Sequence, residues 1–389
     1  MDDLQDIDPN AKPPAGDDSA QADVRVPPDA EYWLALSRLP GVGRATFLKL
    51  IGAYRTPRAA WEQGDAEWQV AGLVRKSIDT QQFRAEALGW AKGQIDALAK
   101  SNWSLIVFGD GRFPSSLTTL HYPPPFFFLL GRLQPAPAVA VVGSRQATDY
   151  GVRATRQIAG DLAAAGVTII SGFARGIDSV AHTAALEANG TTVAVWGSGP
   201  DIVYPAENAK LVGRIAERGG IVTEFPFGAP PEPANFPVRN RLIAGLADGV
   251  LVAQARRRSG ALLTAQHALE QGKEVYAIPG EIGQEQFVGT HELLKQGARI
   301  VTSADDILGA FQMAPASPRP SATATARPLP PLTDIERRVY DAIGGSPCHV
   351  DRLAVSLHMS VGECVRVLTL LELKGLIHKK AGNLIVRSF

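Results

Sequence analysis

Short runs of apolar residues alternate with longer amphipathic segments through the middle of the chain. The runs are too short for helices, and three of them lead directly into glycine or serine, which is typical of buried strands. They lie at residues 139–142, 168–170, 193–196, 220–223, 250–253, 274–278 and 299–301. Strands that alternate with helices indicate βαβ units, so we predict an α/β domain with a doubly wound, mostly parallel sheet over residues 101–310.

The sequence before this domain has a helical pattern. Apolar residues recur at helical spacing through residues 31–99, and a glycine turn at residues 39–45 interrupts them. This turn resembles the hairpin of helix-hairpin-helix modules, whose backbone N–H groups contact nucleic-acid phosphate. The alternative is that Gly41 and Gly43 only allow two helices to turn closely. We predict a small helical domain over residues 30–100, preceded by a disordered tail at residues 1–29.

The sequence after the α/β domain changes to Ala, Pro, Ser and Thr, which is the composition of a linker. We predict a linker over residues 311–331 and a separate module over residues 332–389. Thr333 is a candidate N-cap for the first helix of that module. Three helical segments followed by two short strands predict a winged helix, a fold that binds either DNA or other proteins.

Composition limits the possible functions. Lys plus Arg and Asp plus Glu number 39 each in the 389 residues, so any contact with a polyanion requires a local cluster of charge. Cys348 and Cys364 argue against a disulfide scaffold and match no zinc spacing, so we predict no metal and no cofactor. Residues 1–29 lack a signal-peptide pattern, and the apolar run at 126–130 is too short to cross a membrane. We therefore expect a cytoplasmic protein without membrane contact.

Polar turn residues at the ends of the predicted strands form the main candidate site. Two neighbouring turns supply glycine, serine and arginine, namely Gly143, Ser144, Arg145, Ser171, Gly172 and Arg175. The carboxyl ends of parallel strands meet at one sheet edge, where backbone N–H groups and helix N-termini favour anions. We therefore predict a ligand that carries phosphate, and two adjacent turns favour a polymer. The alternative for Arg145 is a structural ion pair.

A second arginine-rich segment precedes the strand at 250–253. It contains Arg239, Asn240 and Arg241 at a predicted helix start. Guanidinium groups bind phosphate through a planar fork of donors. Phe236 is a candidate to stack on a base, a contact that is indifferent to sequence, and its alternative place is the core.

Signals of enzymatic activity are weak. The chain has neither the G-x-G-x-x-G dinucleotide fingerprint nor the G-x-x-x-x-G-K-[ST] phosphate loop, which disfavours hydride transfer and ATP hydrolysis. Asp178 and His182 are four residues apart on one predicted helix, but no nucleophile or metal cluster accompanies them. A structural hydrogen bond is the favoured interpretation of that pair.

Taken together, these motifs resemble the DNA-processing protein A family (DprA, also called Smf). The resemblance covers residues 139–308. Its motifs are G-S-R at 143–145, S-G-F-A-R-G-I-D at 171–178, G-S-G-P-D at 197–201, F-P-V-R-N-R at 236–241 and S-G-A-L-L-T-A at 259–265. The flanks are similar to the family as domain types, a sterile-alpha-motif-like region and a winged helix.

The resemblance implies a non-sequence-specific single-stranded-DNA-binding protein built on an extended Rossmann-like domain. It further implies a homodimer that promotes loading of the RecA recombinase in natural transformation, and it implies no enzymatic activity. Carried over residue by residue, it places DNA contacts at Gly143, Ser144, Arg145, Ser171, Gly172, Arg239, Asn240 and Arg241. The turn chemistry described above adds Arg175 and Phe236.

The chain also departs from the family pattern. Gln254 stands where many relatives have glutamate, and His291 where asparagine is common. The resemblance offers Leu293, Leu294 and Ile300 as candidate dimer contacts. The alternative function is a nucleotide-processing enzyme similar to the lysine-decarboxylase-like phosphoribohydrolases. Their P-G-G-x-G-T-x-x-E motif is interrupted here, because residues 281–288 separate its two glycine-containing parts.

Overall fold

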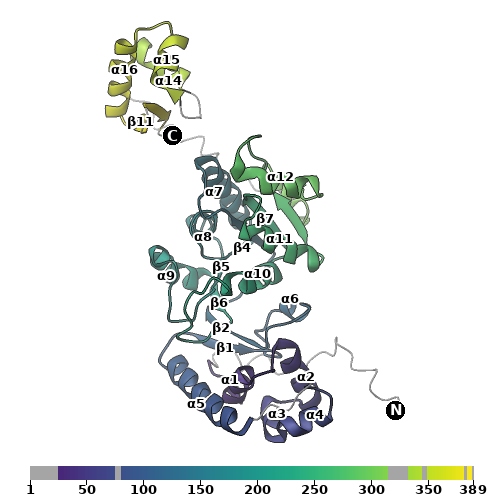
Figure 1. The fold of residues 1–389 in the computed structure, drawn as a ribbon. Helices are drawn as coiled ribbons and strands as arrows, with labels where there is room; N and C mark the ends of the chain where they lie inside the picture. The colour runs from purple at the N-terminus through teal and green to yellow at the C-terminus, as the bar shows by residue number, and fades with distance from the viewer. Residues whose placement is uncertain (1–24, 75–79, 314–331, 344–347, 381–382, 388–389) are drawn as a thin grey trace. The chain divides into compact units, whose positions relative to one another are not determined.

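The computed structural model describes residues 25–74, 80–313, 332–343, 348–380 and 383–387. The chain divides into two units, Met1–Ser317 and Pro318–Phe389. Most of the predicted tail at 1–29 and of the predicted linker at 311–331 lies outside the described residues. The N-terminal helices and the sheet belong to one unit, which Figure 1 shows in purple to green.

The first unit is built on the predicted doubly wound, mostly parallel sheet. Among the described residues it has nine strands in the order β1-β2-β6-β5-β4-β3-β7-β8-β9. Strands β6 to β9 along this order pair in parallel, whereas β2 pairs antiparallel with both β1 and β6. The strands are β1 Ser104–Val107, β2 Phe126–Gly131, β3 Ala138–Gly143, β4 Thr168–Ser171, β5 Thr192–Val195, β6 Gly220–Thr223, β7 Gly249–Gln254, β8 Glu274–Ala277 and β9 Arg299–Ile300.

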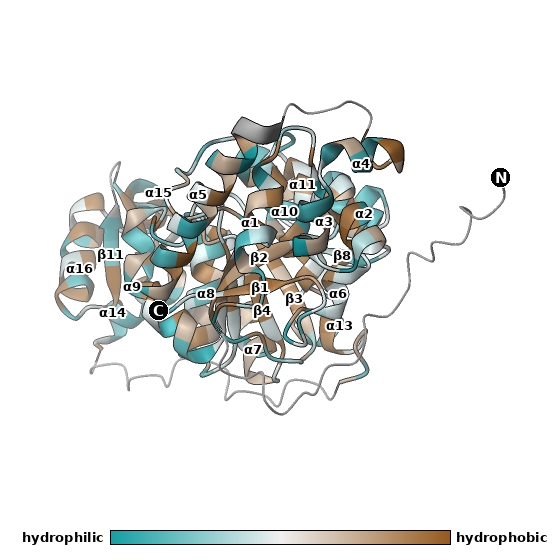
Figure 2. Ribbon diagram, turned by 90° about the horizontal axis from the view of Figure 1, so that it is seen from below, coloured by the Kyte–Doolittle hydropathy of each residue, from teal (hydrophilic) through white to brown (hydrophobic). Residues whose placement is uncertain are grey.

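Helices cover both faces of the sheet, which is why the parallel strands are apolar at almost every position. In β3, Val139 and Val141 pack in one core cluster, whereas Ala140 and Val142 pack in another. Figure 2 shows these central strands in brown. The helices are α6 Ser115–Thr118, α7 Asp149–Ala164, α8 Ile177–Glu187, α9 Ala209–Arg218, α10 Asn235–Leu246, α11 Gly260–Glu270, α12 Val288–Lys295 and α13 Asp305–Leu308, with short 3-10 helices η1 Ala206–Asn208 and η2 Glu285–Phe287.

The N-terminal helices share a hydrophobic core with the antiparallel side of the sheet. Trp33 and Phe47 belong to the same cluster as Phe128 of β2 and Trp196 after β5. The predicted glycine turn separates α1 from α2, and Gly41 has a φ of 79°, a conformation that favours glycine. The helices are α1 Ala30–Arg38, α2 Arg44–Tyr54, α3 Pro57–Gln63, α4 Asp65–Val70 and α5 Thr80–Ala99.

The second unit is a winged helix, as predicted. Thr333 caps the first helix and forms a capping box with Glu336, and Ser360 and Glu363 form another. Cys364 is buried in the core of this unit, and Cys348 is a free thiol beside it. The elements are α14 Asp334–Ala342, β10 Cys348–His349, α15 Val350–Ser356, α16 Val361–Leu373, β11 Ile377–Lys380 and β12 Leu384–Arg387.

The described part of the chain has neither a single helix suited to cross a membrane nor a cluster of metal-binding side chains. No single helix there is long and apolar enough to cross a membrane, although α15 and α16 pass the test as a bent pair. Leu353 and Leu368 of that pair are buried in the winged-helix core. The described part of the chain also contains no group of three or more His, Cys, Asp and Glu side chains able to hold a metal ion.

Candidate nucleic-acid interface

A small pocket lies at the carboxyl ends of β3, β4 and β5. Strand order reverses at β3. From β3 the chain adds β4, β5 and β6 on one side of the sheet, and it then returns to place β7 against the other side of β3. Open α/β sheets bind their ligands at such a point. The pocket is lined by Arg145, Gly172, Ala174, Arg175, Gly197, Ser198, Tyr204, Pro205 and Phe236. The turns that the sequence singled out at 143–145 and 171–175 therefore do meet.

The turn after β3 presents Arg145 to solvent. Its backbone is held because the Ser144 N–H donates to the Gln254 carbonyl at 2.8 Å and the Ser144 carbonyl accepts from Ile177 N–H at 3.1 Å. Gly143 packs so closely that a Cβ there would lie 2.6 Å from the Ile177 side chain. The Arg145 guanidinium carbon lies 5.1 Å from the centre of the Phe236 ring, a cation–π contact. Among the described residues no carboxylate forms an ion pair with Arg145, which leaves the predicted alternative without support.

The turn after β4 begins with buried residues and ends with one exposed arginine. Ser171 is fully buried, and its hydroxyl donates to the Val141 carbonyl at 2.7 Å. Gly172 lies directly over two buried charged side chains, since a Cβ there would be 2.7 Å from Asp178 Oδ2 and 2.8 Å from Arg239 Nη1. Arg175 is on the surface with its side chain 54% exposed. Of this turn, Gly172 and Arg175 line the pocket and Ser171 supports it from below.

Arg239 lies beneath the pocket. It is 4% exposed, and its Nη1 donates to the carbonyls of Gly172 and Val195. Burial lowers the pKa of Arg239 to about 10, so the guanidinium stays charged at neutral pH. The guanidinium also lies 5.8 Å from the Phe236 ring centre. Arg239 thus joins the ends of β4 and β5 to α10 and supports Phe236, rather than presenting its donors to solvent.

Asp178 and His182 are also buried under the pocket. Burial raises the pKa of Asp178, while the charge of Arg239 opposes that rise. Burial lowers the pKa of His182 to about 3, so its ring is neutral, and Nδ1 lies 2.7 Å from the Thr192 hydroxyl. Asp178 accepts a hydrogen bond from the Ala174 N–H at 3.2 Å. Each side chain makes the structural hydrogen bond that the sequence favoured.

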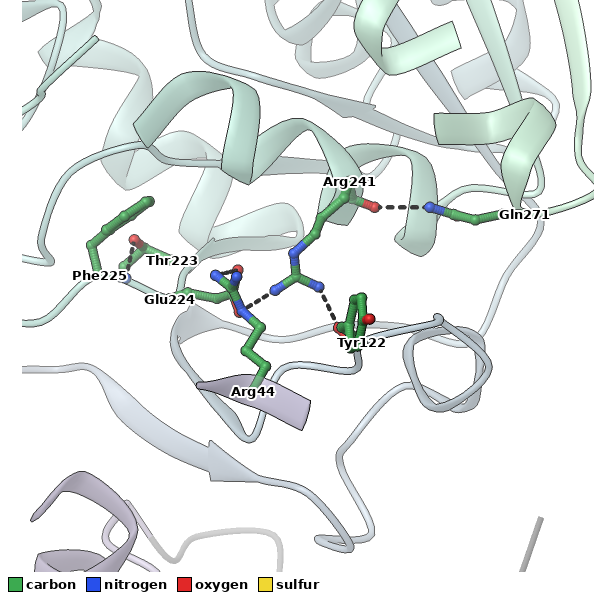
Figure 3. A network of polar contacts seen from close by, with 7 residues as sticks. All are labelled: Arg44, Tyr122, Thr223, Glu224, Phe225, Arg241 and Gln271. Carbon is green, nitrogen blue, oxygen red and sulfur yellow. Dashed lines mark hydrogen bonds and ion pairs between the residues drawn. The ribbon is translucent and has the colours of Figure 1, made fainter. Parts of the chain in front are cut away.

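Asn240 and Arg241 point away from the pocket into the protein. Asn240 is 8% exposed and donates to the Gly260 carbonyl at 3.2 Å. Arg241 pairs with Glu224 and donates to the Tyr122 carbonyl at 2.9 Å, and Arg44 at the start of α2 reaches the same Glu224 at 3.2 Å (Figure 3). This junction ties the N-terminal helices to the sheet. The DNA contacts predicted for Arg239, Asn240 and Arg241 stay predictions, and in this structure each of these side chains donates at least one hydrogen bond within the protein.

Two aromatic rings form one side of the pocket. Phe236 is half-buried, and a Cβ at Gly197 would lie 3.1 Å from its ring. The ring of Tyr204, which is 37% exposed, has its centre 5.8 Å from that of Phe236. Sequence reasoning did not select Tyr204, Gly197 or Ser198 as site residues. The glycine-rich turn after the strand at 193–196 was the available signal.

Comparison with known proteins identifies the family. A model described as DNA recombination-mediator protein A matches residues 104–312, and one described as DprA winged helix domain matches residues 323–383. The chain belongs to the DprA family, also called Smf. This membership confirms the resemblance drawn from the sequence and places the chain among proteins that process DNA in recombination.

Individual DprA and Smf proteins are similar over most of the chain. Protein Smf of Escherichia coli strain K12 is 42% identical over 373 residues, which cover 91% of this chain and 95% of that protein. DNA processing protein DprA of Streptococcus pneumoniae is 40% identical over 205 residues, covering 52% of this chain and 72% of that protein. An X-ray structure of DprA from Streptococcus pneumoniae aligns with a TM-score of 0.58 at 31% identity, covering 72% of this chain and 97% of that one.

Proposed function

We propose that this DprA chain binds single-stranded DNA without sequence specificity at the pocket beyond β3, β4 and β5. One observation carries the proposal: exposed arginines from two neighbouring strand ends, Arg145 and Arg175, line the same pocket as the aromatic rings of Phe236 and Tyr204. Guanidinium groups bind phosphate, and aromatic rings accept unpaired bases. A single strand offers both in alternation, whereas duplex DNA keeps its bases stacked inside.

The chemistry of the pocket favours recognition of the backbone over recognition of sequence. Stacking on Phe236 or Tyr204 suits any base, because every base has a π-face. The N-terminus of α8, which begins at Ile177, adds the positive end of a helix dipole near Arg175. Since the chain as a whole has no net charge, affinity depends on this local cluster.

The same proposal includes the roles that the family resemblance implies. The chain acts in the cytoplasm as a homodimer that promotes RecA loading in natural transformation, without enzymatic activity and without a cofactor. For the dimer, β9 supports the expectation, because it is the edge strand of the sheet and its Ile300 is 57% exposed. Leu293, by contrast, is 8% exposed and packs in the core, so Leu294 and Ile300 are the better candidates for a contact.

Fluorescence anisotropy of a labelled dT oligonucleotide tests the proposed function. We expect tight binding that weakens with salt and survives competition by duplex DNA. Replacing Arg145 with Ala should weaken binding about tenfold and reduce the slope of log K against log salt by about 0.7, the value for one lost phosphate contact. Arg214→Ala is the matched control, since Arg214 is exposed on α9 outside the pocket. Absence of binding by the wild type at low salt would refute the proposal.

A further inference from the structure

The loop after β5 brings a carboxylate to the arginine of the neighbouring turn. Glu207 of η1 accepts from Nε of Arg175 through Oε1 and from Nη2 through Oε2, the second at 3.0 Å. This is the bidentate arrangement in which a guanidinium binds phosphate. In the free protein, Glu207 therefore occupies the fork of donors that the proposed function assigns to DNA.

The position of Glu207 is built into the fold. Its neighbour Asn208 is 8% exposed and donates to the Phe173 carbonyl at 2.9 Å and to the Ser179 hydroxyl at 2.9 Å. Ser179 in turn donates to the Ala174 carbonyl at 2.6 Å. Residues 173 and 174 directly precede Arg175, so buried hydrogen bonds join the backbone of η1 to the turn that carries Arg175. Glu207 is thereby fixed next to Arg175, however the two side chains move.

The ion pair itself is open to exchange. The side chains of Arg175 and Glu207 are 54% and 52% exposed, and an ion pair at that exposure contributes little net stability. The hydrogen bonds from Arg175 lower the pKa of Glu207, so its carboxylate is charged at neutral pH. A phosphate that arrives at Arg175 must therefore displace an anion that is weakly held but always present.

Arg145, unlike Arg175, has no carboxylate bound to its guanidinium among the described residues. Its guanidinium contacts the Phe236 ring, and no carboxylate within the described ranges pairs with it. The two exposed arginines of the pocket are thus unequal before DNA arrives, one open and one occupied. A ligand anchored at Arg145 and on the aromatic rings has the local concentration needed to exchange with Glu207 at Arg175.

We propose that Glu207 is a specificity-determining residue that competes with DNA phosphate for Arg175. This inference rests on the proposed function. Glu207 lowers the affinity of the pocket for any polyanion, so that only a strand also held at Arg145 and the aromatic rings gains the contact with Arg175. The occupant of Arg175 changes on binding, from the Glu207 carboxylate to a phosphate of the bound strand.

Substitution of Glu207 by Gln tests the inference, because it removes the charge and keeps the size of the side chain. In anisotropy titrations with the dT oligonucleotide, we expect Glu207→Gln to raise affinity about two- to fivefold, the strength of an exposed ion pair. The salt dependence should become steeper by up to about 0.7 in slope, because Arg175 then contacts phosphate fully. Glu207→Ala should behave in the same way.

Two comparisons isolate the effect. Glu217→Gln makes the same change in net charge at an exposed position of α9 outside the pocket and should leave affinity unchanged. In an Arg175→Ala background, Glu207→Gln should add nothing beyond this control, because the competition needs Arg175.

The outcomes separate the inference from the proposed function. Equal or weaker binding by Glu207→Gln, with wild-type binding intact and sensitive to Arg145→Ala, overturns the inference alone. Weaker binding would mean that the ion pair orients Arg175 for DNA. No binding of the dT oligonucleotide by the wild type overturns both. A gain that persists in the Arg175→Ala background also overturns the inference, because it would be a general charge effect.

Discussion

At the scale of single residues, the site separates side chains that face the pocket from side chains that support it. Arg145 and Arg175 reach solvent, whereas Arg239 donates to two backbone carbonyls under the pocket. Buried charges are costly unless they are hydrogen-bonded, and Arg239 offsets the charge of the equally buried Asp178. The family resemblance implied a DNA contact for Arg239, as it did for Arg145. Its burial makes it a structural residue.

Replacement of Arg239 by Met should therefore reduce stability as well as binding. We expect a loss of about 3 kcal/mol in the free energy of unfolding, because two carbonyls lose their hydrogen-bond donor and the buried Asp178 loses a nearby positive charge. Denaturant titration measures this free energy of unfolding. The control is Arg214→Met on the surface of α9, which should change stability by less than about 0.5 kcal/mol.

The pH dependence of this variant provides a second readout. Burial raises the pKa of Asp178 above its ordinary value, so the folded chain loses stability as pH rises from that ordinary value to the raised one. Without Arg239 the pKa should rise further. The variant should therefore be less impaired at mildly acidic pH than at mildly alkaline pH. A loss that is independent of pH would contradict the role assigned to the Arg239 and Asp178 charges.

At the scale of elements, the β4 turn illustrates why glycine is required at a particular place. The backbone at Gly172 passes within van der Waals contact of the Asp178 carboxylate and the Arg239 guanidinium, and neither side chain can retreat because both are buried. The requirement for glycine here comes from space. The sequence showed a serine-glycine turn, but it contained no sign of which charges lie below it.

Gly172→Ala should consequently destabilise the protein by about 1–3 kcal/mol, since the added methyl group overpacks the site. It should also weaken single-strand binding through the displaced turn. Gly213→Ala is the matched control: Gly213 lies inside α9 with nothing within 4 Å of an added Cβ. That change should stabilise the helix by about 0.5–1 kcal/mol. Thermal unfolding of both variants measures these changes in stability. A Gly172→Ala variant as stable as the wild type would show that the turn relaxes to accept the methyl group.

At the scale of the whole molecule, the two functions that we propose use separate surfaces. The pocket lies at the carboxyl ends of the central strands, whereas β9 forms an edge of the sheet. The N-terminal helices are held to the sheet by a shared core and by the Arg44, Glu224 and Arg241 junction. The proposed homodimer would use the β9 edge, which leaves the pocket of each copy free for DNA.

Substitution of Ile300 by Asp should disrupt that homodimer, because it places a charge on an exposed apolar position of the edge strand. Analytical ultracentrifugation should show a dimer for the wild type and a monomer for Ile300→Asp, with little change in melting temperature. Val70→Asp on α4 is the control, since Val70 is 84% exposed and far from β9 in the sequence. A wild type that is monomeric at micromolar concentration would rule out the dimer.

Local sequence determined the elements and the family. Apolar strands alternate with amphipathic helices, and glycine, serine and arginine stand at the strand ends, because burial on both faces and tight turns restrict residue type directly. The parallel sheet, the winged helix and the DprA resemblance all followed from such patterns. The meeting of the turns at 143–145 and 171–175 followed as well, since parallel strands end at one edge.

Only the tertiary structure decided which arginines face the pocket. Arg145, Arg175, Arg239 and Arg241 are indistinguishable as guanidinium groups in the sequence, yet two are exposed and two are engaged inside the protein. Arg175 pairs with Glu207 and Arg241 with Glu224, while Arg145 contacts the Phe236 ring, and residue type alone indicates none of these contacts. Burial and pairing are properties of the folded arrangement, and so the charge available to DNA is set by tertiary structure.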